Sequence, residues 1–104
     1  MSEHDRIASL VRNCIGFEWD SGNRFKSLIK HGVSESEAEQ AFFNTPLLFS
    51  AARNSTEERF SVHGKTDSGR ELFVVFTIRL ALIRVISARP MHEIERKEYH
   101  AEAN

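Results

Sequence analysis

An α+β fold, with helices packed on an antiparallel β-sheet in one small domain, is predicted for this chain by three observations. Residues 71–89 are crowded with β-branched and aromatic side chains, which are typical of the centre of a sheet. The segments before and after them carry apolar residues at helical spacing. The length of 104 residues is enough for one hydrophobic core and too short for a second domain.

The run at residues 71–89 is too long for one typical strand. It is bounded by Ser68-Gly69 before and Pro90 after, both of which interrupt regular structure. We therefore divide it near Arg79 and Leu82 into two adjacent antiparallel strands. This hairpin is predicted to be the centre of the sheet, on which the core forms.

Three arginines, Arg79, Arg84 and Arg89, interrupt the hairpin within eleven positions. A guanidinium stays charged, so burying it is costly unless an anion meets it. Strand alternation predicts that Arg84 and Arg89 lie on opposite faces of the second strand. One interpretation is that each arginine pairs with a glutamate or reaches solvent. The other, which three such residues favour, is that they are unpaired cations held toward an anionic ligand.

The first predicted element is a helix at residues 3–13, with Ser2 as its cap. Ile7, Leu10 and Val11 form one apolar stripe, and so short a helix needs packing to persist in water. It is expected to dock on the body of the protein or on a second copy, which would make a homodimer.

Residues 17–19 alternate as a short edge strand, and Asp20 is predicted to cap a helix from residue 21 to 31. Its apolar stripe would be Phe25, Leu28 and Ile29. Gly32 follows, where a glycine commonly ends a helix.

Ser34 and Glu37 form a capping-box pattern that predicts a further helix to about residue 43. Its buried side chains are expected to be Ala38, Ala41 and Phe42. Residues 47–49 and 59–62 are predicted strands, with a polar connector at 51–57 between them and a turn at 63–70 after them. Pro90 suits the first position of a final helix at 91–101, whose more apolar members are Ile94 and Tyr99.

Composition narrows the function classes. The chain is 40% hydrophobic and 28% charged, and no apolar run is long enough to cross a bilayer. The N-terminus lacks the basic and apolar regions of a secretory signal, so a cytoplasmic location is expected. Cys14 is the only cysteine, and no paired metal-ligand spacing occurs, so no metal and no cofactor are expected.

The net charge of −1 is unevenly distributed. Residues 1–58 carry six basic and nine acidic side chains, residues 59–89 six and two, and residues 90–104 two and four. Positive charge is therefore concentrated on the predicted sheet. That pattern suits a sheet that meets phosphates or an acidic partner.

Metal-free RNA cleavage requires a base for the 2′-hydroxyl, a cation for the charge that grows on the phosphate, and an acid for the departing 5′-oxygen. Several residues offer these groups, and residue type does not decide among them. The candidate acids and bases are His31, Glu58 and His63, and the candidate cations are Lys30, Arg59, Arg79, Arg84 and Arg89.

The order of short motifs along the chain is more specific. They are Phe17-Glu18-Trp19-Asp20, Lys30-His31-Gly32-Val33, Glu37-Ala38, Phe42-Phe43, Glu58-Arg59-Phe60, Gly69-Arg70-Glu71-Leu72, Val74-Val75-Phe76-Thr77, Arg79, Ile83-Arg84-Val85-Ile86-Ser87-Ala88-Arg89, Glu95-Arg96 and Tyr99. In this order and spacing the chain closely resembles the BrnT family, from Phe17 to about Tyr99. We accordingly divide it into an N-terminal helical extension at residues 1–16 and a BrnT-like domain at residues 17–104.

The resemblance implies a ribonuclease toxin of a type II toxin–antitoxin module, with a RelE-like fold. It implies a BrnA-like partner, a ribbon-helix-helix antitoxin that neutralises the toxin. The site residues that it implies are Lys30, His31, Glu58, Arg59, Arg79 and Arg84 for catalysis, and Arg70 and Arg89 for RNA binding.

Three positions depart from the family's pattern. Asn23 and Ser27 stand where the family usually has lysine and asparagine, and Pro90 stands where a basic residue is common. The lost lysine predicts weaker RNA binding. Two alternatives to the toxin therefore stay open: a catalytically silent module that keeps the antitoxin-binding surface, and a stand-alone nucleic-acid-binding domain.

Overall fold

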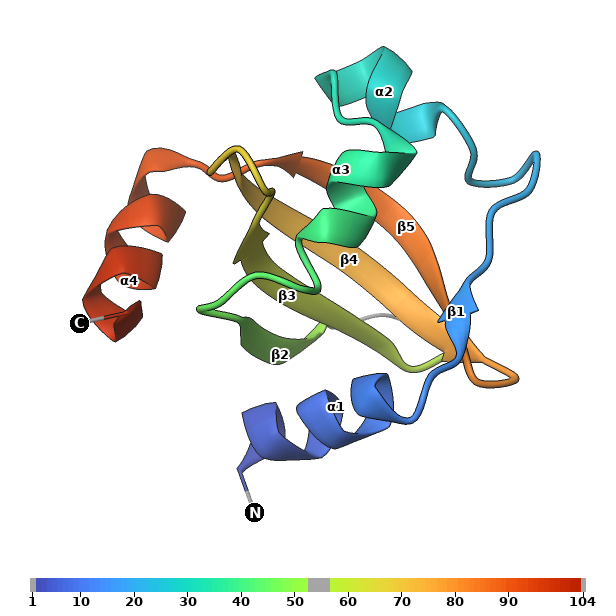
Figure 1. Cartoon of the computed structure of the whole chain (residues 1–104), viewed down its shortest axis with the longest axis horizontal. Helices are drawn as coiled ribbons and strands as arrows, with labels where there is room; N and C mark the ends of the chain where they lie inside the picture. Colours follow the sequence, from blue (N-terminus) through green and yellow to red (C-terminus); the bar gives the residue numbers. More distant parts are fainter. Residues whose placement is uncertain (1, 53–56, 104) are drawn as a thin grey trace.

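A five-stranded sheet in the order β1-β5-β4-β3-β2 forms the body of the protein (Figure 1). The computed structural model describes residues 2–52 and 57–103. β2 to β5 pair antiparallel, and the short β1 pairs parallel with β5, so the predicted α+β fold is confirmed with a mixed sheet. The strands are β1 (Gly16–Phe17), β2 (Leu48–Ala52), β3 (Arg59–Lys65), β4 (Glu71–Arg79) and β5 (Leu82–Pro90).

The predicted hairpin is confirmed as β4 and β5, which turn at Leu80 and Ala81. A bulge interrupts their pairing, because Val75 lies opposite Ser87 while Phe76 lies opposite Val85. Ile86 is thus an extra residue on β5. Such a residue shifts the alternation of the side chains that follow it.

The bulge corrects the prediction that Arg84 and Arg89 lie on opposite faces. Alternate β4 residues 73, 75 and 77 share one face, and their β5 partners are Arg89, Ser87 and Arg84. Arg59 on β3 has the same parity, since its neighbours Ser61 and His63 lie opposite residues 75 and 73. We call this the outer face of the sheet. Arg59 of β3 and Arg84 and Arg89 of β5 all lie on this outer face.

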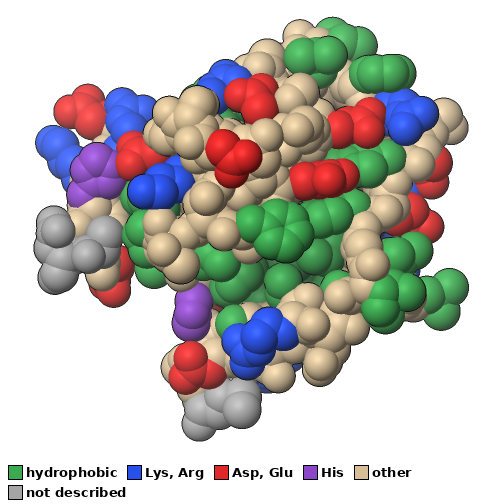
Figure 2. Space-filling view, in the orientation of Figure 1, with side chains coloured by type: hydrophobic (Ala, Val, Ile, Leu, Met, Phe, Trp, Pro, Cys, Tyr) green, Lys and Arg blue, Asp and Glu red, His purple; other side chains and the backbone are tan. Residues whose placement is uncertain are grey.

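The opposite, inner face carries the core. It is covered by α1 and α3. In Figure 1, α3 crosses in front of the sheet and α1 lies below β2 and β3, and Figure 2 shows hydrophobic side chains between them in the same view. Phe76 at its centre is fully buried and contacts the rings of Phe42, Phe49 and Phe60. The helices are α1 (Glu3–Arg12), α2 (Lys26–His31), α3 (Glu35–Gln40) and α4 (Glu93–Ala103).

The N-terminal helix docks on the body of the protein, one of the two placements that we expected for it. Ile7 of α1 is fully buried in the same core. Two α1 side chains also accept backbone amides of the edge strand β2: His4 Nδ1 from Phe49 at 3.0 Å and the Glu3 carboxylate from Ala51 at 3.2 Å. Amides that would be open on an edge strand are therefore satisfied by α1.

The capping box of α3 is confirmed, because the Ser34 hydroxyl accepts the Glu37 amide and the Glu37 carboxylate accepts the Ser34 amide. The burial of Ala38, Ala41 and Phe42 is also confirmed. A Cβ at Gly64 of β3 would lie 2.3 Å from the carbonyl oxygen of Ala41, so this glycine lets the end of α3 approach the sheet.

The helix predicted at residues 21–31 is wrong in its first half. Residues 21–25 form turns in which Asn23 bonds to the sheet, and Phe25 has a left-handed φ of 66° that delays the helix to Lys26. The predicted buried stripe is also wrong, since Phe25, Leu28 and Ile29 are exposed. An asparagine side chain that bonds to backbone elsewhere competes with helix formation.

Pro90 ends β5 opposite Leu72, so its predicted place at the start of the last helix is wrong. Tyr99 of α4 is buried and its hydroxyl donates to the Pro46 carbonyl at 2.6 Å, whereas Ile94 is exposed. Of the connector predicted at 51–57, residues 53–56 lie outside the described residues, and Ala51 and Ala52 belong to β2. No helix of the described chain is long and apolar enough to span a membrane.

Candidate nucleic-acid interface

A groove of about 460 Å³ lies where α2, the end of β5 and the residue before α4 meet. Its walls are rich in basic side chains. The lining residues are Lys26, Ser27, Lys30, His31, Ile86, Ser87, Arg89 and His92. Positive side chains around a concave surface focus their field and attract anions. Lys30, His31 and Arg89 of the predicted site are thus brought together here.

Lys30 and His31 occupy the last turn of α2, which Gly32 ends in a left-handed conformation with φ 67°. Arg70 holds this end in place, because its guanidinium donates to the Gly32 carbonyl at 2.9 Å and to the Glu37 carboxylate at 3.0 Å. The Ser34 amide, and after it Arg70, keeps the pKa of Glu37 below its ordinary value. Arg70 thereby positions the groove without lining it.

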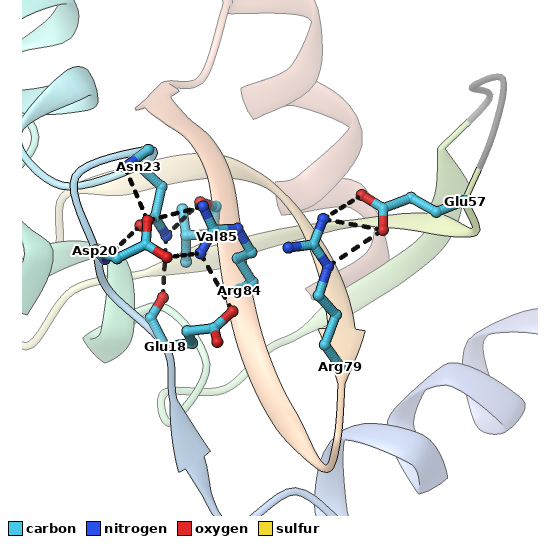
Figure 3. Close-up of polar contacts among 8 residues, drawn as sticks. Glu18, Asp20, Asn23, Glu57, Arg79, Arg84 and Val85 are labelled. Carbon is cyan, nitrogen blue, oxygen red and sulfur yellow. Dashed lines mark hydrogen bonds and ion pairs between the residues drawn. The ribbon is translucent and has the colours of Figure 1, made fainter.

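Asn23 and Ser27 attach the groove's α2 wall to β5 (Figure 3 shows Asn23). The Asn23 amide donates to the carbonyls of Glu18 and Val85, both at 3.0 Å, and its oxygen accepts the Asp20 amide. The Ser27 hydroxyl accepts the Ala88 amide at 2.9 Å. Asn23 and Ser27 therefore satisfy backbone groups at the β5 edge beyond β1.

Arg84 lies between two carboxylates at the other end of β5 (Figure 3). Its guanidinium contacts Asp20 at 2.8 Å and Glu18 at 3.2 Å, and its side chain is 11% exposed. The hydrogen bond from Arg84, and after it the Gly22 amide, lowers the pKa of Asp20 to about 2. The same pairing raises the pKa of Arg84.

Arg79 and Glu58 also have ionic partners. Arg79 pairs with Glu57 at 3.1 Å (Figure 3), and Glu58 pairs with Arg6 of α1 at 3.2 Å. Neither residue lines the basic groove. Arg84 and Arg89 are paired with carboxylates as well. The expectation that the three hairpin arginines are unpaired is therefore wrong.

Arg89 reaches the groove while bound to α4. Its guanidinium donates to Glu95 at 2.8 and 3.0 Å and stacks over the Phe73 ring, 4.5 Å from the centroid. These bonds, followed by the His92 amide, lower the pKa of Glu95 to about 2. His63 Nε2 lies 3.6 Å from the same carboxylate, outside the groove lining.

Arg59 differs from the other strand arginines. It lies half-buried on the outer face and has no ion pair or hydrogen bond from its side chain to any residue in 2–52 or 57–103. The structure therefore separates the predicted site into a basic groove, an isolated Arg59, and arginines tied to carboxylates.

Two groove residues were missed by sequence reasoning, Lys26 and His92. They lie 66 positions apart, and neither belongs to a motif that marks it. Lys26 is the first residue of α2 and lines the groove from there. His92 enters because β5 runs on to Pro90 and leaves only a short link before α4. No local pattern of the sequence indicates either arrangement.

Among residues 2–52 and 57–103, no three His, Cys, Asp or Glu side chains are grouped so as to hold a metal ion. The groove's polar groups are cations, imidazoles and hydroxyls. They suit a phosphate-bearing ligand.

The fold and this groove define a small α+β domain that presents a cationic concave surface, as proteins do that contact nucleic-acid backbones. The family of ribonuclease toxins named BrnT, of type II toxin–antitoxin systems, matches residues 19–95. The chain belongs to this family. A search of curated protein sequences finds no match.

Proposed function

We propose that this chain is a toxin that cuts single-stranded RNA at the α2–β5 groove without a divalent metal ion. The family supports ribonuclease toxicity and, through the type II system, an antitoxin partner and an RNA target. The observation that carries the proposal is the lining of the groove. It joins Lys26, Lys30, Arg89 and two histidines, and none of its described lining residues carries a carboxylate.

The substrate backbone would run from this groove across the outer face. Ser87, Val75 and Ser61 form a cross-strand row there, in which Ser87 and Val75 are half-buried and Ser61 is buried. Arg59 lies beside this row with its guanidinium uncommitted among the described residues. Lys30 at one end and Arg59 at the other would each contact a phosphate.

The groove's own chemistry supports the proposed metal independence. Its lysines and Arg89 can stabilise the negative charge of the transition state. Its histidines can transfer protons near neutral pH. The same cations disfavour the approach of Mg²⁺.

The antitoxin is proposed to be a ribbon-helix-helix protein that covers the groove with an acidic segment. Electrostatic complementarity would speed its association and make binding sensitive to salt. It would therefore compete with RNA. Full RNA cleavage in the presence of a saturating cognate partner would contradict this mode of neutralisation.

The direct test is cleavage of a labelled single-stranded RNA by the purified chain in EDTA. We expect cleavage by the wild type and a loss of about 10-fold or more in Lys30→Ala, because one cation leaves the transition state. Lys97→Ala is the matched control, since Lys97 of α4 is 75% exposed and lies outside the groove. Cleavage that requires Mg²⁺ would contradict metal independence.

One observation favours a second candidate, the catalytically silent module. Position 23, where a lysine is usual by resemblance, holds an asparagine that is 6% exposed and committed to the backbone. A folded chain that binds its partner and cuts no RNA with or without Mg²⁺ would establish this alternative.

A further inference from the structure

The basic groove holds two imidazoles that come from separate elements. His31 ends α2, and His92 lies in the link between β5 and α4. Among the groove's described lining residues, they are the only side chains that can both accept and donate a proton near neutral pH. Lysine and arginine at such pH act as fixed cations.

The two histidines have different neighbours. His92 Nδ1 lies 3.8 Å from Glu95 Oε1, and the same carboxylate oxygen accepts the His92 backbone amide at 2.7 Å. The Arg89 guanidinium contacts the same carboxylate at 2.8 Å, so Glu95 joins His92 to a groove cation.

No described carboxylate is paired with His31. It is flanked by Lys26 and Lys30 on its own helix, with Arg89 on the β5 wall. His31 thus lies among cations that can hold a phosphate, whereas His92 lies on a separate element beside a carboxylate. Two imidazoles from separate elements of one groove match the two proton transfers of RNA cleavage.

We propose that His31 and His92 form the acid–base pair that cleaves RNA in this groove, with His31 as base and His92 as acid. This assignment depends on the function proposed above. His31 takes the proton of the 2′-hydroxyl as the bond from O2′ to phosphorus forms. His92 gives its proton to O5′ as the bond from phosphorus to O5′ breaks.

The products are a 2′,3′-cyclic phosphate on one fragment and a 5′-hydroxyl on the other. His31 ends protonated and His92 neutral, and exchange of one proton each with water restores both. Lys30 and Arg89 supply the positive charge that the phosphorane-like transition state requires. No water molecule, metal ion or cofactor is consumed.

The test uses His31→Gln and His92→Gln of the full chain, with His100→Gln on α4 as a histidine control outside the groove. Two oligoribonucleotides are compared, one with an ordinary 5′-oxygen and one with sulfur bridging at the cleaved bond. A thiolate leaves without a proton, so the sulfur substrate needs no acid. Because the His92 side chain is 72% exposed, its variant is expected to fold, and thermal unfolding checks this.

On the oxygen substrate we expect both variants to be slower than wild type by about 10²–10⁴-fold. On the sulfur substrate His92→Gln should recover to within about 10-fold of wild type, and His31→Gln should not. The wild-type pH–rate profile should be bell-shaped, and His92→Gln should lose its alkaline limb.

Two results would overturn the assignment while leaving the proposed function intact. One is that the wild type cleaves the oxygen substrate and His92→Gln cleaves it equally fast. The other is sulfur rescue of His31→Gln in place of His92→Gln. A wild type inactive on both substrates would instead overturn the proposed ribonuclease itself.

Discussion

The two ends of β5 hold their neighbouring cations in different ways. At the start, Arg84 is enclosed by Glu18 and Asp20. Beside the C-terminal end of β5, Lys30 and His31 of α2 line a groove, and they have no ion pair within residues 2–52 and 57–103. A cation that is already neutralised stabilises the fold, whereas an open one is available to a ligand.

This difference separates stability from function along one strand. We expect substitutions around Arg84 to lower the free energy of unfolding. Substitutions of Lys30 and His31 in the groove should lower RNA binding and cleavage and leave that free energy almost unchanged. Arg89 is intermediate, since it lines the groove while bound to Glu95.

The largest effect is expected from Asn23→Ala, which removes the bonds that hold the Asp20 loop against β5. Three hydrogen bonds of a buried side chain are lost, and the carbonyls of Glu18 and Val85 lose their donor. The free energy of unfolding should fall by about 2–3 kcal/mol. Urea unfolding measures it.

The matched control is Asn13→Ala, at an exposed asparagine that ends α1. Its free energy of unfolding should stay within about 0.5 kcal/mol of wild type. Equal values for the two variants would remove the structural role assigned to Asn23. The same result would also reopen Asn23→Lys as a way to strengthen RNA binding.

A smaller loss in the free energy of unfolding is expected when the pH is lowered. The folded pKa values of Asp20 and Glu95 are both about 2, below their ordinary values of 3.8 and 4.5. The unfolded chain therefore binds more protons in this range. The stabilisation is fully present above about pH 5 and is lost as pH falls toward 2.

Unfolding measured between pH 5 and pH 2.5 checks this dependence. Arg84→Met should weaken the contribution of Asp20 to the pH dependence of the free energy of unfolding. Arg89→Met should weaken the contribution of Glu95 in the same way. Lys30→Met should keep the wild-type slope, because Lys30 pairs with no described carboxylate. If the free energy of unfolding of Arg84→Met depended on pH as in the wild type, Arg84 would not be what lowers the pKa of Asp20.

The elements that the sequence predicted well are those whose signals are local. Ser34 and Glu37 cap α3 within one turn, and the residue types of β4 and β5 suit a half-buried strand. The interior of the hairpin was harder. Alternation assumes an unbroken ladder, so the extra residue Ile86 reversed the predicted face of Arg89.

The candidate site was only partly predictable. Lys30, His31 and Arg89 were named from the sequence, and they meet in the groove. Lys26 and His92 were not named, because tertiary bonds decide where α2 begins and how far β5 extends. Likewise the carboxylates that neutralise Arg84 come from residues 64 and 66 positions away.

The central claim is that open groove cations, and not the paired arginines Arg79 and Arg84 outside the groove, bind the RNA backbone. Its most direct test is the salt dependence of affinity for a 2′-O-methylated oligoribonucleotide, which binds and cannot be cut. For single strands, each lost phosphate contact lowers the slope of log K against log salt by about 0.7. Lys26→Ala/Lys30→Ala should therefore lower it by about 1.4, and Arg79→Ala, whose side chain pairs with Glu57, should leave it unchanged. A lowered slope in Arg79→Ala beside a wild-type slope in the double variant would contradict the claim.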